Sequence, residues 1–482
     1  MQLHWHRRDL RVVDNRGLTA AAEARPIAPL FVFDQAVLEH AGSPRVRYML
    51  DALAELRASY QSLGSDLLVA HGDPKAVVPA VAAALEADGV VWNTDYSGVA
   101  RERDANVRSA LDDASVSYES VHDAIFHPPG SITTNAGDPY SVYTYFWKKW
   151  RDRDKPDPYP EPDADSLVDA AVLEAASETL SDADFDVAVG DLPTISDLGF
   201  DEPSADIVSA GTDAARKRLA DFCEDAIYRY ADDRDYPARN ATSRLSTDLK
   251  FGTIGIREVY AATAEAREGV GGEQDESVET FQSQLAWREF YAHVLRYNPN
   301  VVTENYKEYE HDIQWRDDSD ELAAWKEGRT GYPIVDAGMR QLKKEAYMHN
   351  RVRMIVASFL TKDLLCNWRH GYDHFREYLS DHDTANDNGG WQWAASTGTD
   401  AQPYFRIFNP MTQGERYDPD GEYIKKYVPE LEGVAASTIH EWHEISETER
   451  DRVAPNYPAP IVDHAERREM ALSMFETARG DD

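Results

Sequence analysis

A stretch near the C-terminal end combines acidic side chains with two indoles. It reads D-H-D-T-A-N-D-N-G-G-W-Q-W-A-A-S-T-G-T-D-A-Q-P-Y-F, from Asp381 to Phe405. Trp391 and Trp393 follow directly on Asp, Asn and Gly residues, although an indole buries a large apolar surface. We therefore expect a site in which aromatic rings lie beside hydrogen-bonding groups.

An arginine upstream of this stretch supplies the opposite charge. Arg353 lies within the helical pattern R-V-R-M-I-V-A-S-F-L, and Asp381 and Asp383 follow it in the chain. A buried Arg–Asp pair is costly to assemble and often marks a polar ligand site. The alternative is an ion pair with a purely structural role.

Most of the Trp residues lie in the second half of the chain. A single Trp there would be typical of a core. The set as a whole favours a site, because it lies among Asn and Gln residues and among arginines on helical segments. The indoles are Trp287, Trp315, Trp325, Trp368, Trp391 and Trp393; the amides are Asn367, Asn388 and Gln392; the arginines are Arg288, Arg351 and Arg353.

The segment T-S-R-L-S, from Thr242 to Ser246, offers hydroxyl groups at a predicted helix start. Hydroxyls and exposed backbone N–H groups at such a place form a cradle for an anion. Helix capping without a ligand is the alternative, and by itself this segment favours capping.

The elements that must position these residues fall into two patterns. The first third alternates short apolar runs with helical spacing, which predicts a doubly wound parallel sheet. The expected strands are Leu3–His6, Ile27–Phe33, Asp66–His71, Gly89–Asn93 and Ser117–Val121, and the expected helices between them include Val46–Leu63 and Lys75–Ala87. From Thr212 onward the spacing is helical throughout.

The chain therefore divides into three expected parts: an α/β domain over 1–130, a connector over 131–210 and an all-helical domain over 211–482. The connector is acidic, with no Lys or Arg between Asp157 and Ala210. Such a composition predicts a partly extended linker with short helices and no binding role.

Composition bounds the function. Net charge is −37, which argues against a basic nucleic-acid-binding face but leaves room for a local basic groove in a salty cytoplasm. The two cysteines, Cys223 and Cys366, have no metal-binding spacing, so no metal site and a reducing compartment are expected. No apolar run approaches ~20 residues, so we expect a cytoplasmic protein with no membrane contact.

The motifs together resemble one family, the photolyases and cryptochromes, and specifically class I DNA photolyases. The similarity runs from Trp5 to His464. It is carried by W-H-R-R-D-L-R (5–11), the text at Asp138–Tyr143, T-S-R-L-S (242–246), L-A-W-R-E-F-Y (285–291), T-G-Y-P-I-V-D-A-G-M-R (330–340), M-H-N-R-V-R-M (348–354) and G-G-W-Q-W-A-A-S-T-G-T-D (389–400).

The resemblance implies a light-driven lyase. Its fold would be an α/β antenna domain followed by a helical domain that holds FAD. Reduced FAD would pass an electron to a cyclobutane pyrimidine dimer flipped out of damaged DNA. The protein is expected to act as a monomer.

Family roles transfer to this chain residue by residue. FAD contacts would be Tyr230, Thr242, Ser243, Arg244, Leu245, Ser246, Arg288, Asn350, Arg353, Asp381, Asp383 and Asp387. The electron relay would be Trp391, Trp368 and Trp315. Trp287 and Trp393 would sandwich the dimer beside Gln284, Asn350 and Met354, and Arg234, Arg351 and Arg406 would contact phosphates.

A second chromophore is also implied. Relatives with a deazaflavin antenna place ligands where this chain has Arg8, Phe31, Asp34, Arg45, Asp95 and Lys250. The text L-K-F-G-T-I-G-I (249–256) resembles those relatives more than folate-binding ones. An empty antenna pocket is the alternative.

Two positions depart from the family pattern for dimer repair. Gln284 stands where Glu is usual, and an amide can donate a hydrogen bond but not a proton. Gln there is usual in (6-4) photolyases, but Asn350 and Met354 stand where that branch has two His. The cyclobutane dimer therefore remains the expected substrate, and a (6-4) lesion is the lesser alternative.

Asp387 is the second departure, because dimer photolyases usually carry Asn there and plant cryptochromes carry Asp. A protonated Asp387 beside a reduced flavin could deliver a proton. The main alternative function is therefore a blue-light receptor, although the chain lacks a long tail after His464. A flavin protein whose Trp residues serve redox exchange without light is the third hypothesis.

Overall fold

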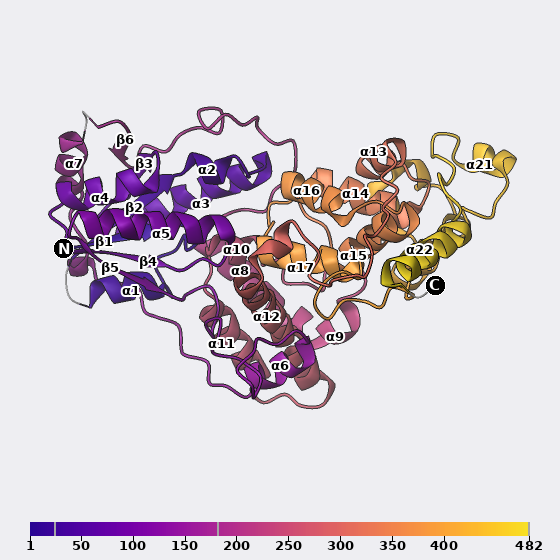
Figure 1. Ribbon diagram of the computed structural model, residues 1–482, viewed down its shortest axis with the longest axis horizontal. Coiled ribbons are helices and arrows are strands. Elements are labelled where there is room, and N and C mark those ends of the chain that lie inside the picture. Colours follow the sequence, from indigo (N-terminus) through magenta and orange to yellow (C-terminus); the bar gives the residue numbers. More distant parts are fainter. Residues whose placement is uncertain (24–25, 181–182, 481–482) are drawn as a thin grey trace. The chain divides into compact units, whose positions relative to one another are not determined.

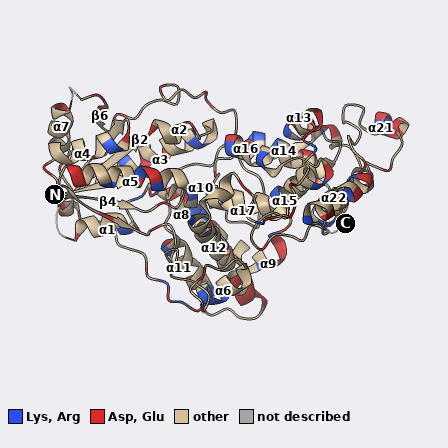
Figure 2. Cartoon of the chain, viewed as in Figure 1, with Lys and Arg blue, Asp and Glu red and all other residues tan. Residues whose placement is uncertain are grey.

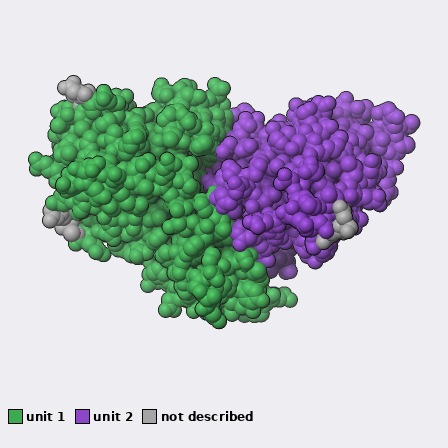
Figure 3. Space-filling view, viewed as in Figure 1, with its two compact units in different colours: residues 1–203, 208–228, 243–299 green, residues 204–207, 229–242, 300–482 purple. Residues whose placement is uncertain are grey.

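The chain folds into two compact units, drawn as ribbons in Figure 1 and coloured separately in Figure 3. Each unit has its own apolar cluster of buried residues. The computed structural model describes residues 1–23, 26–180 and 183–480. Unit 1 contains residues 1–203, 208–228 and 243–299, and unit 2 contains 204–207, 229–242 and 300–482. Asp and Glu residues are distributed over helices and loops of both units (Figure 2).

Unit 1 is built on a six-stranded sheet. Its strands are β1 (Gln2–His6), β2 (Ile27–Phe33), β3 (Leu68–His71), β4 (Gly89–Asn93), β5 (Ser117–Val121) and β6 (Asp186–Val189). The order is β5-β4-β1-β2-β3-β6, and β6 alone among them pairs antiparallel, with β3. The register places Gln2 of β1 opposite Ile27 of β2 and Gly89 of β4.

Strand β1 shows why helices cover both faces. Leu3 and Trp5 belong to the apolar cluster that also contains buried residues of α4 and α5, such as Val77 and Val107. His6, on the opposite face, lies against Tyr60 of α3, with His6 Nε2 and the Tyr60 hydroxyl 2.6 Å apart. Side chains alternate across a strand, so two buried faces require two layers of helices. The prediction of a doubly wound parallel sheet is confirmed.

The helices of unit 1 lie around this sheet and extend beyond it. They are α1 (Arg16–Ala22), α2 (Gln35–Leu38), α3 (Ser43–Ser62), α4 (Pro74–Ala84), α5 (Gly98–Asp113), α6 (Tyr143–Arg151), α7 (Ala170–Thr179), α8 (Thr212–Glu224), α10 (Ser246–Phe251), α11 (Ile256–Arg267) and α12 (Glu273–Tyr297), with short 3₁₀ turns at Ala164–Ser166 and Ala226–Arg229.

The compact units do not follow the expected boundaries at 130 and 210. Buried polar contacts hold α8, α10 and α11 in the same unit as the sheet. The Tyr48 hydroxyl on α3 donates to Asp248 on α10 at 2.6 Å, and Arg218 on α8 donates to the same carboxylate at 2.6 Å. Ordinary helical spacing cannot show such partners, since they come from distant parts of the chain.

The acidic connector contributes more than a linker. Its residues 186–189 form β6, the sixth strand of the sheet, and α7 packs beside it. Val168 N donates to Ile27 O at 2.9 Å, which fixes the start of this segment on β2. The expected short helices are present, and the edge strand is additional.

Unit 2 is helical among its described residues. Its elements are α9 (Tyr230–Asp233), α13 (Ser319–Glu327), α14 (Pro333–Glu345), α15 (Asn350–Ser358), α16 (Trp368–Tyr378), α17 (Thr384–Ala394), α18 (Pro410–Tyr417), α19 (Glu422–Tyr427), α20 (Ala436–His440), α21 (Glu447–Val453) and α22 (His464–Arg479). Short turns lie at Pro299–Val302 and Pro429–Leu431, and Phe359–Asp363 is a π-helix that continues α15.

The core of unit 2 is unusually aromatic. Trp325, Trp368, Trp391 and Trp442 lie in one apolar cluster and are each at most 2% exposed. Across the described residues, no helix is both long and apolar enough to cross a membrane.

Candidate functional site

Arg353 on α15 is the centre of a buried polar cluster in unit 2. Its Nη2 donates to Asp381 Oδ2 at 2.7 Å, and its Nη1 lies 3.6 Å from Asp387 Oδ1. Its Nε donates to the Met348 carbonyl at 2.8 Å, which fixes the plane of the guanidinium. Burial by itself would lower the pKa of Arg353, but Asp381 and Asp387 outweigh burial and raise it.

The hydrogen bonds of the Arg353–Asp381 pair are incomplete at Asp381. Asp381 is 5% exposed, and within the described part of the chain its Oδ1 atom has no hydrogen-bond partner. A buried carboxylate oxygen without a donor costs free energy, so native structures seldom keep one without a reason. Asp381 Oδ1 is thus poised to accept a hydrogen bond from a bound group.

Asp387, one turn into α17, faces two more partners. Its Oδ2 lies 2.6 Å from His382 Nδ1 and accepts the backbone N–H of Asp383 at 3.2 Å. Asp383 itself caps α17, because its Oδ1 accepts from Asn386 N at 3.1 Å and from the Asn386 side chain. The expected flavin contact at Asp383 therefore has a helix-capping role as well.

The three indoles expected to form the relay all belong to unit 2. Trp391 packs against α16, with its ring 4.9 Å from that of Phe375, and no side chain would fit at Gly371 beneath it. Trp368 is the first residue of α16. Trp315 precedes Arg316, whose N–H donates to Leu365 O at 2.8 Å, just before Trp368.

Exposure separates one of the three indoles from the other two. Trp391 and Trp368 are buried, whereas Trp315 is only partly buried. The Trp368 indole donates to Asn305 at 2.9 Å. Trp315 is thus the indole of this set that solvent reaches.

The amides between the indoles have a structural role. Gln392 donates to Val301 O at 2.8 Å and accepts from Tyr306 N at 2.9 Å. Asn388 donates to the same Val301 carbonyl at 2.6 Å. They hold residues 301–306 against α17 and so fix Trp393, which is half-buried on the same helix.

The expected lesion and phosphate residues of unit 2 lie at the start of α15 and near α9. Exposed Asn350 and half-buried Met354 are one turn apart, and the Asn350 amide lies 3.9 Å from the Met354 sulfur. Arg351 donates to Asp235 at 2.6 Å, and Arg234 lies 3.9 Å from the same carboxylate. An acidic residue therefore divides the expected basic rim, while Arg406 is exposed.

In unit 1, α12 carries Gln284, Trp287 and Arg288. Trp287 stacks on Tyr143 of α6, with ring centroids 3.6 Å apart and 12° between the planes. The Tyr143 hydroxyl donates to the Ser283 carbonyl, which locks this stack to the helix. Tyr143 thus supports one face of Trp287, a role that the sequence did not indicate because the two residues are far apart in the chain.

Two polar residues of α12 differ in where their hydrogen-bond partners lie. The Gln284 amide donates to Thr280 O at 3.1 Å and to Ser283 Oγ at 2.9 Å. Arg288 donates to the carbonyl oxygens of Ala124 and Leu249. These contacts orient both side chains in unit 1.

Comparisons with known proteins agree over the whole chain. The family model described as DNA photolyase matches residues 2–163, and that described as FAD binding domain of DNA photolyase matches residues 281–477. A protein of Halobacterium salinarum named deoxyribodipyrimidine photo-lyase is 62% identical over 495 residues, covering 100% of both chains. The chain belongs to the DNA photolyase family.

Other members of the family are more distant but also full-length. A deoxyribodipyrimidine photo-lyase of Synechococcus is 41% identical over 98% of this chain and 96% of its own. A solved class III photolyase from Agrobacterium tumefaciens has a TM-score of 0.88 at 35% identity, covering 99% and 98%. A Synechocystis cryptochrome structure has a TM-score of 0.87 at 25% identity, covering 98% and 99%.

The photolyase residues of unit 2 fit the FAD that its domain implies. Asp381 Oδ1 supplies an open acceptor, and Arg353 supplies a fixed cation beside it. Tyr230 is buried, and burial raises its pKa to about 12, so its hydroxyl remains a neutral donor. Thr242 lies in unit 2 and Ser243 to Ser246 in unit 1, where Leu245 N donates to Ser243 Oγ at 3.5 Å and Ser246 begins α10.

Three of the expected antenna residues meet in unit 1. Arg8 donates to Lys250 O at 3.2 Å and to Asp95 at 3.4 Å. Burial would raise the pKa of Asp95, but nearby cations, Arg8 foremost, outweigh burial and hold it at about 2. Elsewhere, Asp34 caps α2, Phe31 packs on Phe33, and Arg45 donates to His40 O at 2.7 Å.

One group of potential metal ligands lies in unit 1, at the start of the photolyase sheet. His4, His6 and Asp9 bring three ligand atoms within 4.8 Å of one another. However, Asp9 Oδ2 already accepts from the amides of Asn93 at 2.7 Å and Asn15 at 2.9 Å. Amide N–H groups aimed at the same oxygen indicate a hydrogen-bonded core network.

Proposed function

We propose that this photolyase repairs cyclobutane pyrimidine dimers in DNA, using light and a bound FAD. The observation that carries the proposal is the open Arg353–Asp381 pair, in the same unit as two buried indoles, Trp391 and Trp368, and the partly buried Trp315. Support comes from the named function of the Halobacterium salinarum relative at 62% identity.

We assign flavin binding, electron transfer and stacking on the lesion to different residues of the chain. Arg353 and Asp381 would bind and orient the flavin, and Trp391, Trp368 and Trp315 would conduct an electron to it from the surface. When bound and reduced, FAD supplies under blue light the electron that splits the dimer. Trp287 and Trp393 would stack on the flipped bases, since every base offers an aromatic face.

Gln284 would donate a hydrogen bond to the dimer. Both N–H groups of its amide are donated in this structure, to Thr280 O and Ser283 Oγ, so one of these bonds would be exchanged for the dimer carbonyl, which an amide cannot protonate. A (6-4) lesion needs an acid at the site. Asn350 and Met354 provide none, and this favours the cyclobutane dimer.

A blue-light receptor is the second candidate, and Asp387 is the residue that favours it. Its carboxylate lies beside Arg353 and His382, a setting suited to holding or passing a proton.

The antenna chromophore is the subject of a separate proposal. We propose a deazaflavin-type chromophore near Arg8 and Asp95, while a Sulfolobus tokodaii photolyase was solved with two FAD molecules.

The test is a light-dependent assay. The purified protein is loaded with FAD, reduced, mixed with an oligonucleotide containing one thymine dimer and illuminated with blue light. Restoration of thymines only in the light is expected. No loss of dimers would overturn repair and favour the receptor.

The relay has its own test. Trp391→Phe should block photoreduction of the oxidised flavin, because the first electron donor is gone, while chemically reduced enzyme keeps repairing. Trp325→Phe is the matched control, since Trp325 is buried in the same core with its ring 6.1 Å from that of Trp391. Equal photoreduction in Trp391→Phe and wild type would remove Trp391 from the relay.

A further inference from the structure

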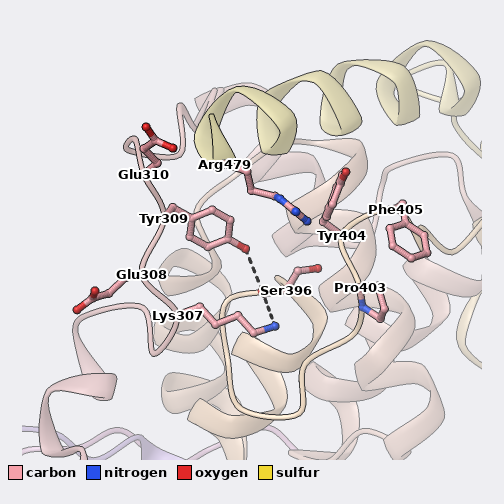
Figure 4. A pocket seen from close by; sticks show the side chains of 9 residues that line it. All are labelled: Lys307, Glu308, Tyr309, Glu310, Ser396, Pro403, Tyr404, Phe405 and Arg479. Atoms are coloured by element: carbon pink, nitrogen blue, oxygen red, sulfur yellow. Dashed lines mark hydrogen bonds between the residues drawn. The ribbon is translucent and has the colours of Figure 1, made fainter. Parts of the chain in front are cut away.

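A cavity of about 410 Å³ opens in unit 2 beside the segment that follows Trp393 (Figure 4). Its walls are residues 307–310, Ser396, residues 403–405 and Arg479. This volume falls within the range of about 300–1,000 Å³ that is usual for small-molecule sites. None of the assigned flavin, relay or lesion residues lines it.

Cationic and hydroxyl groups point into this cavity. In Figure 4 the Arg479 guanidinium lies between Tyr309 and Tyr404, and the Lys307 amino group and the Ser396 hydroxyl lie below it, whereas the Glu308 and Glu310 carboxylates point away. The lining thus contains two cations, Lys307 and Arg479, and two carboxylates that face outward. It favours an anionic ligand.

A buried lysine lies directly behind Ser396. Lys362 is 1% exposed, and its Nζ donates to Ser396 Oγ at 2.9 Å and to Ala395 O at 3.3 Å. In the described part of the chain it forms no ion pair; its other neighbour is the Phe475 ring, 3.7 Å away. Burial, with the charge of Lys307 as a second cause, lowers the pKa of Lys362 well below its usual value, and Lys362 also lies in the π-helix, an irregularity frequent at functional sites.

The lysine prepares Ser396 as a donor. Because Ser396 Oγ accepts from Lys362, its own hydroxyl proton remains to be donated outward. The residue is held in place from the other side, since its carbonyl accepts from the Tyr309 hydroxyl at 3.0 Å and from Lys307 at 3.4 Å. Its φ of 69° is strained for a non-glycine residue, as often occurs at ligand sites.

An aromatic platform adjoins these polar groups. Phe405 is 58% exposed, although a Phe side chain in water is unfavourable. It packs edge-on against Tyr404, whose ring is covered by the Arg479 guanidinium at 5.1 Å. An exposed ring next to cations is the arrangement that binds single-stranded nucleic acid, the base on the ring and the phosphate on the cations.

The residues that line the cavity are joined by backbone hydrogen bonds to Trp393 and its neighbours, where we expect the lesion to bind. Gln402 N donates to Trp393 O at 3.2 Å, and Lys307 N donates to Thr397 O at 2.8 Å, so the cavity wall is tied to the end of α17. We propose that this cavity binds one nucleotide, with its base against Phe405 and its phosphate on Lys307, Ser396 and Arg479. The proposal rests on the proposed action on DNA, where the nucleotide would flank the lesion; a free mononucleotide shares the same chemistry.

The experiment measures affinity as flanking nucleotides are added. Full-length, flavin-loaded protein is titrated with single strands that carry a thymine dimer and no, one, three or five nucleotides on either side. Affinity of the wild type should rise when the nucleotide that fills the cavity is added. Phe405→Ala should lower affinity for the longer strands by about tenfold and leave the dimer without flanks unaffected.

Matched variants separate base, phosphate and general charge effects. Ser396→Ala and Lys307→Gln should each lower the affinity for the longer strands, because each variant removes a proposed contact with the phosphate. Tyr118→Ala, an exposed aromatic of unit 1, and Lys217→Gln, an exposed lysine of α8, should have no effect on flank dependence. Far-UV circular dichroism and flavin content verify folding for every variant.

A second arm uses dAMP and inorganic phosphate. Binding of dAMP to wild type but not to Phe405→Ala, without flank dependence, would assign the cavity to a free mononucleotide. The nucleotide proposal would be overturned if inorganic phosphate bound the cavity as tightly as dAMP and Phe405→Ala bound dAMP like the wild type. It would also be overturned if neither flank dependence nor dAMP binding were found. If the wild type binds no dimer at all, the proposed function fails, while the dAMP arm still decides the cavity.

Discussion

Two buried Arg–Asp clusters, one in each unit, differ in whether their hydrogen bonds are complete. In unit 1, Arg11, Asp14, Asp123 and Arg257 are each between 0% and 3% exposed. Arg257 donates to both carboxylates, and Arg11 donates to Asp123 at 2.6 Å. Within the described chain, no buried side-chain atom of these four lacks a partner. We call them the closed cluster.

The Arg353–Asp381 pair of unit 2 is open by comparison, because Asp381 Oδ1 has no partner among the described residues. Burial and opposite charge are common to both places, so neither identifies a ligand site. The difference between the two places is the unsatisfied acceptor atom of Asp381. The closed cluster holds α11 to the turn at Asp14, whereas we expect the open pair to receive a bound group.

The largest effect is expected from breaking the closed cluster. Arg257→Gln leaves Asp14 and Asp123 buried without their cation, which should lower the free energy of unfolding by about 3–5 kcal/mol. Chemical denaturation at constant salt measures this. Arg316→Gln, which breaks a surface pair with Glu321, should cost under about 1 kcal/mol. Equal losses would mean that closure contributes nothing.

The next largest effect is a pH dependence of the free energy of unfolding, caused by a buried carboxyl group that has no cation in contact with it. Glu289 accepts the backbone N–H groups of Phe126 at 2.8 Å and His127 at 3.0 Å, and burial raises its pKa from 4.5 to about 7. The folded state then holds this proton more tightly than the unfolded chain does. Stability should therefore fall as pH rises from about 4.5 to about 7, by on the order of 3 kcal/mol.

Unfolding measured across that pH range tests this cost. Glu289→Gln removes the titration, so this part of the pH dependence should disappear even though the variant loses one backbone hydrogen bond. If the variant keeps the slope of the wild type, another group is responsible.

The open pair should affect the cofactor more than the fold. Asp381→Asn keeps the shape but removes the charge that holds Arg353, so flavin affinity should fall about 10- to 100-fold. Equilibrium dialysis of FAD gives the constant. Asp418→Asn is the matched control, because Asp418 is equally buried but bonds the backbone of Tyr423 and Ile424. Matching flavin affinities in the two variants would contradict an open site at Asp381.

The sequence predicted the sheet well because its signals are local. The expected Ile27–Phe33, Gly89–Asn93 and Ser117–Val121 agree with β2, β4 and β5 residue for residue, since each is an apolar or alternating run between turns. It missed β6, because four residues in an acidic segment become a strand only through the free edge of β3. The sequence also did not predict the boundary between the two compact units, because that boundary depends on contacts between distant residues, such as Tyr48 with Asp248.

Family membership and the FAD-binding domain were likewise predicted from motifs, and both are confirmed. The expected roles of single residues remain predictions. What the motifs could not give is the surroundings: Tyr143 behind Trp287, His382 beside Asp387, and Lys362 behind Ser396. Each of these contacts joins residues by packing or by a turn, and none has a spacing that marks it in the sequence.

The smallest effect on flavin affinity is expected at Asp387, the residue that favours the proposed receptor alternative. Arg353 lies 3.6 Å from Asp387 but 2.7 Å from Asp381, so Asp387→Asn leaves the stronger ion pair intact. Flavin affinity should fall only about two- to fivefold. Reduced enzyme should still repair dimers, because the cation beside the flavin stays in place.

His382 gives the control for this change. His382→Gln removes the neighbour 2.6 Å from Asp387 but keeps the carboxylate, so any effect that both variants share belongs to the pair. The measurements are the FAD dissociation constant, the repair yield per photon and the pH dependence of flavin photoreduction. A repair yield that collapses in Asp387→Asn would show that the acid is required for the chemistry. An unchanged yield with an altered pH profile would mean that Asp387 controls a proton near the flavin while Arg353 and Asp381 hold it.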